Sequence, residues 1–135
     1  MTAGYSGTPL AKKLTLKDGM CVWFDGMPAS VREEVDESGL DLSDQMSPDD
    51  GFDAGHIFVT VKASLVSKLN DLRARVHSDG QVWVSWPKKA SGVQSEVDEH
   101  DVRAAGLDAG FVDIKKCAVD ETWSGLKFVI PKDQR

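Results

Sequence analysis

The apolar residues of this chain fall into short blocks that are separated by turn-forming residues. Three of these blocks, residues 20–24 (MCVWF), 56–61 (HIFVTV) and 81–86 (QVWVSW), are mainly apolar without strict alternation of polar positions. Runs of this kind are typical of parallel strands that are buried on both faces. We therefore predict three parallel strands at these positions.

Helical spacing occurs between the apolar runs. The most regular stripe is formed by Leu65, Leu69, Leu72 and Val76, which predicts a helix that reaches Val76. A second helix is expected over residues 29–37. A third is expected from about residue 96, with Ser95 as its N-cap, to Gly110.

The two ends of the chain add a short helix and a hairpin. Thr8 is expected to cap a helix with Pro9 at its first position, where the missing N–H has no cost. Residues 111–119 and 126–130 read as two strands joined by the loop DETWSG. Lys115 and Lys116 mark the first of these strands as the exposed edge, because lysine discourages edge-to-edge pairing. The last strand would then lie inside the sheet.

The order of these elements predicts a single α/β domain over residues 1–135. We expect a three-layer sandwich with a mostly parallel, Rossmann-like sheet of about five strands and a C-terminal antiparallel hairpin. Residues 1–17 would form an N-terminal helical arm. The segment DLSDQMSPDDGFD, residues 41–53, would form an acidic surface loop.

Composition removes several classes of function. A formal net charge of -6 argues against sequence-independent binding to nucleic acid, which depends on clustered Lys and Arg. The absence of a long apolar run argues against membrane spanning, and the polar N-terminus favours a cytoplasmic location. The isolated histidines offer no metal-ligand spacing. Cys21 and Cys117 lie in apolar runs and are expected to be buried free thiols.

A candidate site follows from the predicted sheet. Ligands of open parallel sheets bind outside the carboxyl ends of the strands, where the loops 25–28, 60–62 and 87–92 would lie. A parallel fourth strand would bring DETWSG to the same edge. The candidate ligand-binding residues are Asp25, Gly26, Trp86, Lys88, Lys89, Ser91, Asp120, Glu121, Trp123 and Ser124.

Two interpretations of this edge remain open. The lysines, with Ser91 and the backbone of Gly92, could hold a phosphate or carboxylate beside a tryptophan ring. Alternatively, Lys88 and Lys89 could pair with Asp120 and Glu121 and only fix the loops. The sequence contains no dinucleotide fingerprint, phosphate-loop motif or serine nucleophile elbow.

Several stretches of the chain resemble a known family. GYSGTPLAKKL, HIFVTVKASL, WVSWPKKASGV and CAVDETWSGLKFV are similar to the short bacterial proteins grouped as domain of unknown function 3052. The similarity covers most of the chain except residues 36–53. It implies little about activity, because that family is uncharacterised.

The order of elements also resembles a trimmed class I S-adenosylmethionine-dependent methyltransferase. Such enzymes imply a glycine-rich loop after the first strand and an acidic residue at the end of the second, which contacts the ribose. Here the first loop reads DGMP, and only DLSDQMSPDDG is available for the second and third strands. The sequence requires no cofactor, and S-adenosylmethionine enters only through this resemblance in architecture.

We therefore carry three hypotheses of function. The first is a non-catalytic binding or regulatory module that uses the carboxyl edge of its sheet to bind an anionic small molecule or a protein partner. The second is a divergent methyltransferase-like group-transfer enzyme, in which Asp120 and Glu121 could serve as general acid or base. The third is a purely structural protein. The oligomeric state stays open.

Overall fold

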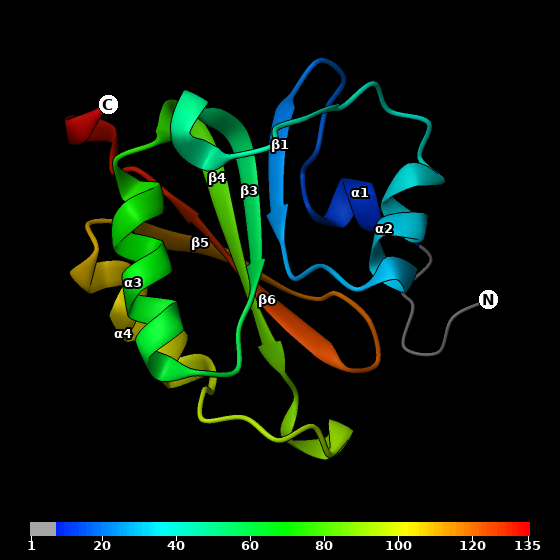
Figure 1. The fold of residues 1–135 in the computed structure, drawn as a ribbon, viewed down its shortest axis with the longest axis vertical. Coiled ribbons are helices and arrows are strands. Elements are labelled where there is room, and N and C mark those ends of the chain that lie inside the picture. Colours follow the sequence, from blue (N-terminus) through cyan, green and yellow to red (C-terminus); the bar gives the residue numbers. More distant parts are fainter. Residues whose placement is uncertain (1–7) are drawn as a thin grey trace.

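A twisted sheet forms the middle layer of the molecule (Figure 1). The structure is a computed structural model that describes residues 8–135. Within these residues the sheet has six strands in the order β2-β1-β3-β4-β6-β5. The strands are β1 (Cys21–Asp25), β2 (Ser43–Asp44), β3 (Phe52–Phe58), β4 (Val76–Pro87), β5 (Val112–Ala118) and β6 (Trp123–Val129).

The predicted mixture of parallel and antiparallel pairing is confirmed. β1 is parallel to β2 and β3, and β3 is parallel to β4, whereas β6 is antiparallel to both β4 and β5. β5 therefore runs in the same direction as β4 and forms the sheet edge, as its lysines predict. β6 lies inside the sheet.

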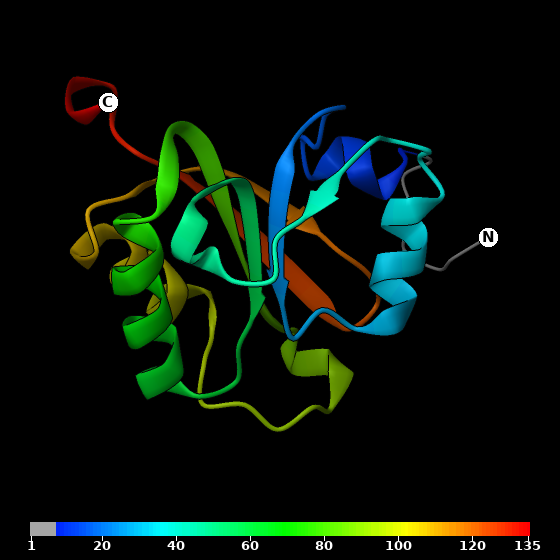
Figure 2. The same ribbon diagram turned by 45° about the horizontal axis from the view of Figure 1, so that its top comes forward.

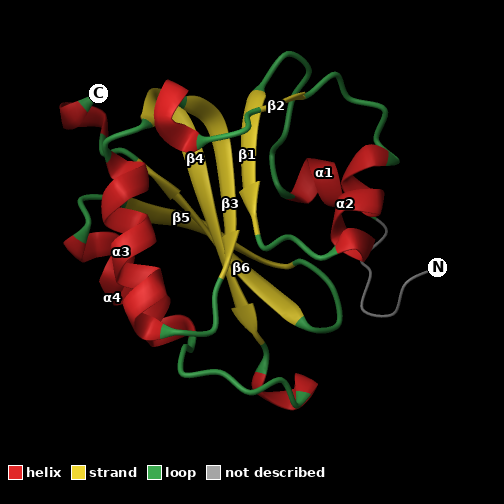
Figure 3. Cartoon of the chain, in the orientation of Figure 1, coloured by secondary structure: helices red, strands yellow, loops and turns green. Residues whose placement is uncertain are grey.

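Helices cover both faces, which completes the three layers (Figures 2 and 3). One core lies between the sheet and the pair α3 and α4, and a second core lies beneath α1 and α2. The helices are α1 (Leu10–Lys13), α2 (Ala29–Asp36), α3 (Lys62–Arg73) and α4 (Glu99–Asp108), with 3-10 turns η1 (Pro48–Asp50), η2 (Lys89–Ser91) and η3 (Lys132–Gln134).

Alternation along β4 assigns its side chains to the two cores. Val84 and Trp86 belong to the core on the α3 and α4 side, and Trp83 belongs to the core on the α1 and α2 side. The indole N–H of Trp83 donates to the main-chain oxygen of Leu14 at 2.9 Å. Trp83 is thus a core residue that also fixes the end of α1.

Three predicted boundaries are wrong. Thr8 does not cap the first helix, because Pro9 occupies the cap position and no side chain bonds to the helix N-terminus. α3 ends at Arg73, and Val76 instead begins β4. The strand predicted over residues 81–86 therefore begins earlier, at Val76, and its pairing with β3 shifts register between Phe52 and Ala54. The apolar stripe from Leu65 to Val76 therefore extends beyond the end of α3.

The start of α4 also differs from the prediction. Asp98, not Ser95, is the N-cap, and its carboxylate accepts the N–H of Asp101 at 3.0 Å. The Asp101 carboxylate in turn accepts the N–H of Asp98 at 3.1 Å, which completes a capping box. The hydroxyl of Ser95 bonds to the main chain of Val97, so Ser95 stabilises the preceding turn.

The predicted acidic loop is shorter than residues 41–53. It contains the two-residue strand β2 and the turn η1, and β3 already begins at Phe52, whose side chain is fully buried. Cys21 and Cys117 are free and half-buried. Within residues 8–135, no helix is long and apolar enough to cross a membrane.

Candidate functional site

The carboxyl ends of β4 and β5 bring the two most distinctive sequence stretches together. The N–H of Lys88 donates to the main-chain oxygen of Thr122 at 2.8 Å, and Pro87 is the register partner of Trp123. The ammonium group of Lys88 donates to the main-chain oxygen of Asp120, also at 2.8 Å. The expected proximity of WPKK and DETWSG is therefore present.

The carboxylates in this region do not form the ion pairs considered from the sequence. One oxygen of the Asp120 carboxylate accepts the N–H groups of Thr122 and Trp123, at 2.8 and 2.7 Å. Glu121 is exposed and takes part in no ion pair among residues 8–135. Asp120 is thus a turn residue, and Lys88 ties that turn to the end of β4.

Ser91 is also committed to local structure. Its hydroxyl donates to the main-chain oxygen of Lys88 at 2.6 Å and accepts the N–H of Val93 at 3.2 Å. Gly92 follows in the left-handed region with φ of 77°, a conformation that glycine adopts without strain. The serine therefore shapes the loop after β4.

The candidate tryptophans lie on opposite faces of the sheet. Trp86 belongs to the core on the α3 and α4 side, and Ser124 is its register partner in β6. Trp123 packs edge-on against Phe58 on the other side, with ring centroids 5.1 Å apart. A single ligand cannot contact both rings across the sheet, so the predicted residues divide into two groups.

Asp25 and Gly26 lie at the end of β1, apart from the lysine loop. A carboxylate oxygen of Asp25 forms an ion pair with Lys68 of α3 at 2.7 Å. Gly26 has φ of 74°, and a Cβ at this position would stand 3.4 Å from the main-chain oxygen of Phe58. The first loop is thus held close to β3 and tied to α3.

A groove with a volume of about 450 Å³ opens between the end of β4 and the start of α4. Trp86 forms part of its wall with only 5% of its surface exposed, and Val97 is 4% exposed. Among the predicted site residues, Trp86, Lys88 and Lys89 line this groove. Its other polar lining residues include Glu96, Asp98, Glu99 and His100.

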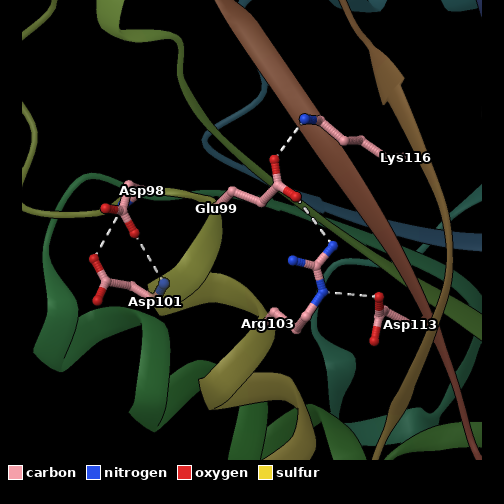
Figure 4. Close-up of polar contacts among 6 residues, drawn as sticks. All are labelled: Asp98, Glu99, Asp101, Arg103, Asp113 and Lys116. Carbon is pink, nitrogen blue, oxygen red and sulfur yellow. Dashed lines mark hydrogen bonds and ion pairs between the residues drawn. The ribbon is translucent and has the colours of Figure 1, made fainter.

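The acidic residues of the groove are engaged in bonds within the protein. Glu96 accepts the N–H of Lys62 at 3.1 Å, and Asp98 caps α4. Glu99 bonds to Lys116 of β5 and to Arg103 of its own helix (Figure 4). The contacts of Glu99 hold the start of α4 against β5, and the carboxylates of Glu96 and Asp98 accept backbone N–H groups.

The basic residues Lys89 and His100 of the groove form fewer contacts than its acidic residues. Lys89 and His100 are exposed, and neither forms a hydrogen bond or an ion pair through its side chain with any residue in the range 8–135. The pKa of Asp98 is lowered chiefly by the hydrogen bond from the Asp101 N–H, with further contributions from the positive charges of Lys89 and His100. Lys89 and His100 therefore both lie near the groove's acidic wall and remain available to a ligand.

Sequence reasoning missed the second wall of the groove. Glu96, Val97 and Asp98 were assigned to a helix that would begin after Ser95, so the segment before α4 was not considered. The pair Asp98 and Asp101 is the signal that identifies the true helix start, because each acid can bond to the other's backbone N–H. That boundary leaves residues 93–97 free to border a cavity.

His56 is close to a hydroxyl but lies away from the groove. Its Nε2 is 2.7 Å from the Ser85 hydroxyl, and both residues are buried. Burial lowers the pKa of His56 to about 3. Among residues 8–135, no cluster of three or more His, Cys, Asp or Glu could hold a metal.

Several solved structures with a similar fold are methyltransferases. A SAM-dependent methyltransferase from Aquifex aeolicus aligns with a TM-score of 0.65 and 18% identity, over 90% of this chain and 88% of that one. A TehB-like SAM-dependent methyltransferase from Corynebacterium glutamicum gives 0.58 and 9%, over 96% and 91%. A methyltransferase from Pyrococcus furiosus gives 0.56 and 11%, over 88% and 78%. At these identities the likeness establishes a methyltransferase-like fold.

Comparison of sequences identifies the family of the chain, which comparison of folds does not. No curated protein matches the chain significantly. The family model described as "Protein of unknown function (DUF3052)" matches residues 11–132. This match extends through every strand of the sheet, and the chain belongs to the DUF3052 family.

Proposed function

We propose that this protein is a non-catalytic binding module that holds a small anionic molecule in the groove between the end of β4 and α4. The proposal rests on a difference between the acidic residues of the groove and its basic residues Lys89 and His100. Its acids bond within the protein, whereas the side chains of Lys89 and His100 form no hydrogen bond or ion pair within residues 8–135. A lysine ammonium group and an imidazole N–H beside a concave wall favour a carboxylate or phosphate group on the ligand.

The rest of the groove wall is partly apolar. Trp86, Pro87 and Val97 supply apolar surface on its walls. Ligand sites commonly combine such walls with a few placed polar groups. A concave groove of about 450 Å³ suits a small molecule better than the flat surface of a protein partner.

A non-catalytic role is supported by what the reactive groups near this edge do. The Ser91 hydroxyl and the Asp120 carboxylate are engaged in turns. The hydroxyl of Ser95 bonds to the main chain of Val97. A nucleophilic hydroxyl needs a base within hydrogen-bond reach. Within residues 8–135, neither the Ser91 hydroxyl nor the Ser95 hydroxyl bonds to a side-chain base.

Group transfer with S-adenosylmethionine is the second candidate, and the shared fold favours it. The residues present do not fit the cofactor. Asp25 at the end of β1 is paired with Lys68, and Asp44 at the end of β2 is held by Arg32 at 3.0 Å. The first loop has Gly26 alone before Pro28. The acidic side chains at the ends of β1 and β2 therefore both form ion pairs within the protein.

Thermal unfolding with a ligand panel tests the proposal. The panel contains S-adenosylmethionine, nucleotides, sugar phosphates and aromatic carboxylates. A ligand at a hundredfold excess over its Kd stabilises the folded state by about 2.7 kcal/mol. We expect an anionic member to raise the Tm of the wild type, with a smaller rise in Lys89→Ala and His100→Ala. Lys132→Ala removes an exposed lysine outside the groove and should respond like the wild type.

The possible outcomes separate the two candidate functions. Stabilisation by S-adenosylmethionine alone, unaffected by Lys89→Ala, would favour group transfer and overturn the groove proposal. A panel without any stabilising member would also reject a small-anion ligand. Stabilisation that depends on Lys89 and His100 supports the groove.

A further inference from the structure

The β5 and β6 hairpin presents different side chains on its two faces. Asp113 and Lys116 of β5 point toward α4, where they bond to Arg103 and Glu99 (Figure 4). The sheet register changes between Asp113 and Lys115. Since successive side chains in a strand alternate, Lys115 points to the opposite face. Lys115 is therefore separated from the groove by the sheet.

Lys115 stands directly opposite another lysine. Its register partner in β6 is Lys127, and the partner of Lys127 in β4 is Trp83. Directly paired residues on antiparallel strands share a face. Trp83, Lys127 and Lys115 thus form a row across three neighbouring strands.

The segment that follows α1 adds a third lysine to this row. The main-chain oxygen of Leu14 accepts the indole N–H of Trp83, so this segment lies over the row. The ammonium group of Lys115 donates to the main-chain oxygen of Lys13 at 2.8 Å. Lys17 follows on the same segment, and its charge contributes to lowering the pKa of Lys127 after burial and Lys115.

The three lysines have no acidic partner within the described range. No ion pair among residues 8–135 includes Lys17, Lys115 or Lys127. Lys17 also borders a hollow with Asp18, Asp53 and Asp79 but forms an ion pair with none of them within residues 8–135. Like charges directly opposite in a sheet destabilise it, and the half-buried position of Lys127 adds a desolvation cost.

Protection of the sheet edge explains only part of this arrangement. Lys115 lies on the edge strand, where lysine discourages pairing with another sheet. Lys127 lies on β6, between β4 and β5, and protects no edge. A half-buried lysine inside the sheet, opposite another lysine in a chain with a net charge of -6, requires a different reason.

We propose that Lys17, Lys115 and Lys127 form a second anion site, which binds a small, multiply charged phosphate such as a diphosphate. Lysine ammonium groups act as compact point charges that suit phosphate, whereas carboxylates are matched best by the fork of arginine. A bound diphosphate would supply the negative charge that the row lacks and relieve the repulsion between its lysines. The site is independent of the groove beside α4, which lies across the sheet.

Thermal unfolding in low salt with inorganic pyrophosphate tests this site. Lys127→Thr keeps a residue that is favourable in strands and removes the central charge. We expect this variant to melt about 3 °C above the wild type without pyrophosphate, because the repulsion is gone. Pyrophosphate should raise the Tm of the wild type but not that of Lys127→Thr. Lys132→Thr is the matched control and should behave like the wild type in both conditions.

Further arms distinguish this site from its alternatives. Lys17→Thr should reduce the response to pyrophosphate, while Lys89→Ala should retain it. Loss of the response in Lys89→Ala together with its retention in Lys127→Thr would place the anion in the groove and overturn the proposal. An equal rise with sodium chloride of the same ionic strength would reduce the effect to screening. A larger rise with citrate than with pyrophosphate would reject phosphate as the ligand class.

Discussion

The ammonium group of Lys88 donates a hydrogen bond to the main-chain oxygen of Asp120, 2.8 Å away, and not to its carboxylate. The carboxylate instead accepts the backbone N–H groups of Thr122 and Trp123. One lysine of the Lys88 and Lys89 pair therefore stabilises the fold, while the other remains available to a ligand. Substitution of Lys88 therefore tests stability at the carboxyl edge, and substitution of Lys89 tests ligand binding there.

Lys88→Ala should destabilise the protein, whereas Lys89→Ala should not. The first variant loses a half-buried, charge-assisted hydrogen bond, which we expect to cost about 1–2 kcal/mol of unfolding free energy. The side chain of Lys89 is exposed and has no such bond, so its removal should change stability by less than about 0.5 kcal/mol. Urea denaturation measures both values. Equal losses in the two variants would contradict this division of roles.

Asp120→Ala should cost about 1–2 kcal/mol, because two backbone N–H groups of the turn lose their acceptor. Asp120→Asn keeps a side-chain oxygen at this position and should retain most of the stability. Comparison of the two variants by urea denaturation separates the hydrogen bonds from the charge. If the asparagine variant is as unstable as the alanine variant, the negative charge is the more important feature.

The broad architecture could be predicted from the sequence because it depends on local patterns. The apolar runs at β1, β3 and β4 and the lysines of β5 correctly indicated a mostly parallel sheet with an exposed final edge. The short strand β2 gave no such signal, because its two residues, Ser43 and Asp44, are polar and exposed. Its strand character comes from pairing with β1.

The candidate site was predicted only in part, since hydrogen-bond partners depend on tertiary structure. The sequence placed Lys88 near Asp120 but could not show that the bond is to the main chain. It also could not place Trp86 and Trp123 on opposite faces, because the register of β6 against β4 decides this. The groove wall at Glu96 depended on one helix boundary, at Asp98.

Asp98→Ala should weaken both the helix and the groove. Loss of the N-cap should cost about 1 kcal/mol. Asp98→Asn retains a good capping oxygen and should be close to the wild type. Thermal unfolding of the two variants, with and without the ligand identified by the panel, measures both effects. Full ligand stabilisation in Asp98→Ala would show that the cap does not position the groove.

Gly106→Ala should destabilise the protein, although alanine is the better helix former by about 1 kcal/mol. A Cβ at Gly106 would stand 2.1 Å from a ring carbon of Phe128, so α4 can approach β6 this closely only with glycine. We expect a loss of about 1–3 kcal/mol by urea denaturation. Combining Gly106→Ala with Phe128→Leu should cost less than the sum of the single changes. A stabilised Gly106→Ala variant would rule out this steric contact.

His56 predicts how stability depends on pH. Its ring is fully buried, Nε2 contacts the Ser85 hydroxyl at 2.7 Å, and Nδ1 has no hydrogen-bond partner within residues 8–135. Burial lowers its pKa to about 3, whereas an unfolded histidine titrates near pH 6.5. Below about pH 6.5 the unfolded state therefore binds a proton that the folded state excludes. The contribution of His56 to stability falls with decreasing pH until the pH approaches the folded-state pKa.

Replacing the ring by a group that does not titrate should remove this dependence. His56→Gln keeps an amide that can bond to Ser85, so the variant retains a partner for the hydroxyl. Between about pH 6 and 4, the wild type should lose up to about 1.4 kcal/mol per pH unit more than His56→Gln. Parallel pH profiles for the wild type and His56→Gln would contradict the exclusion of a proton from the buried ring.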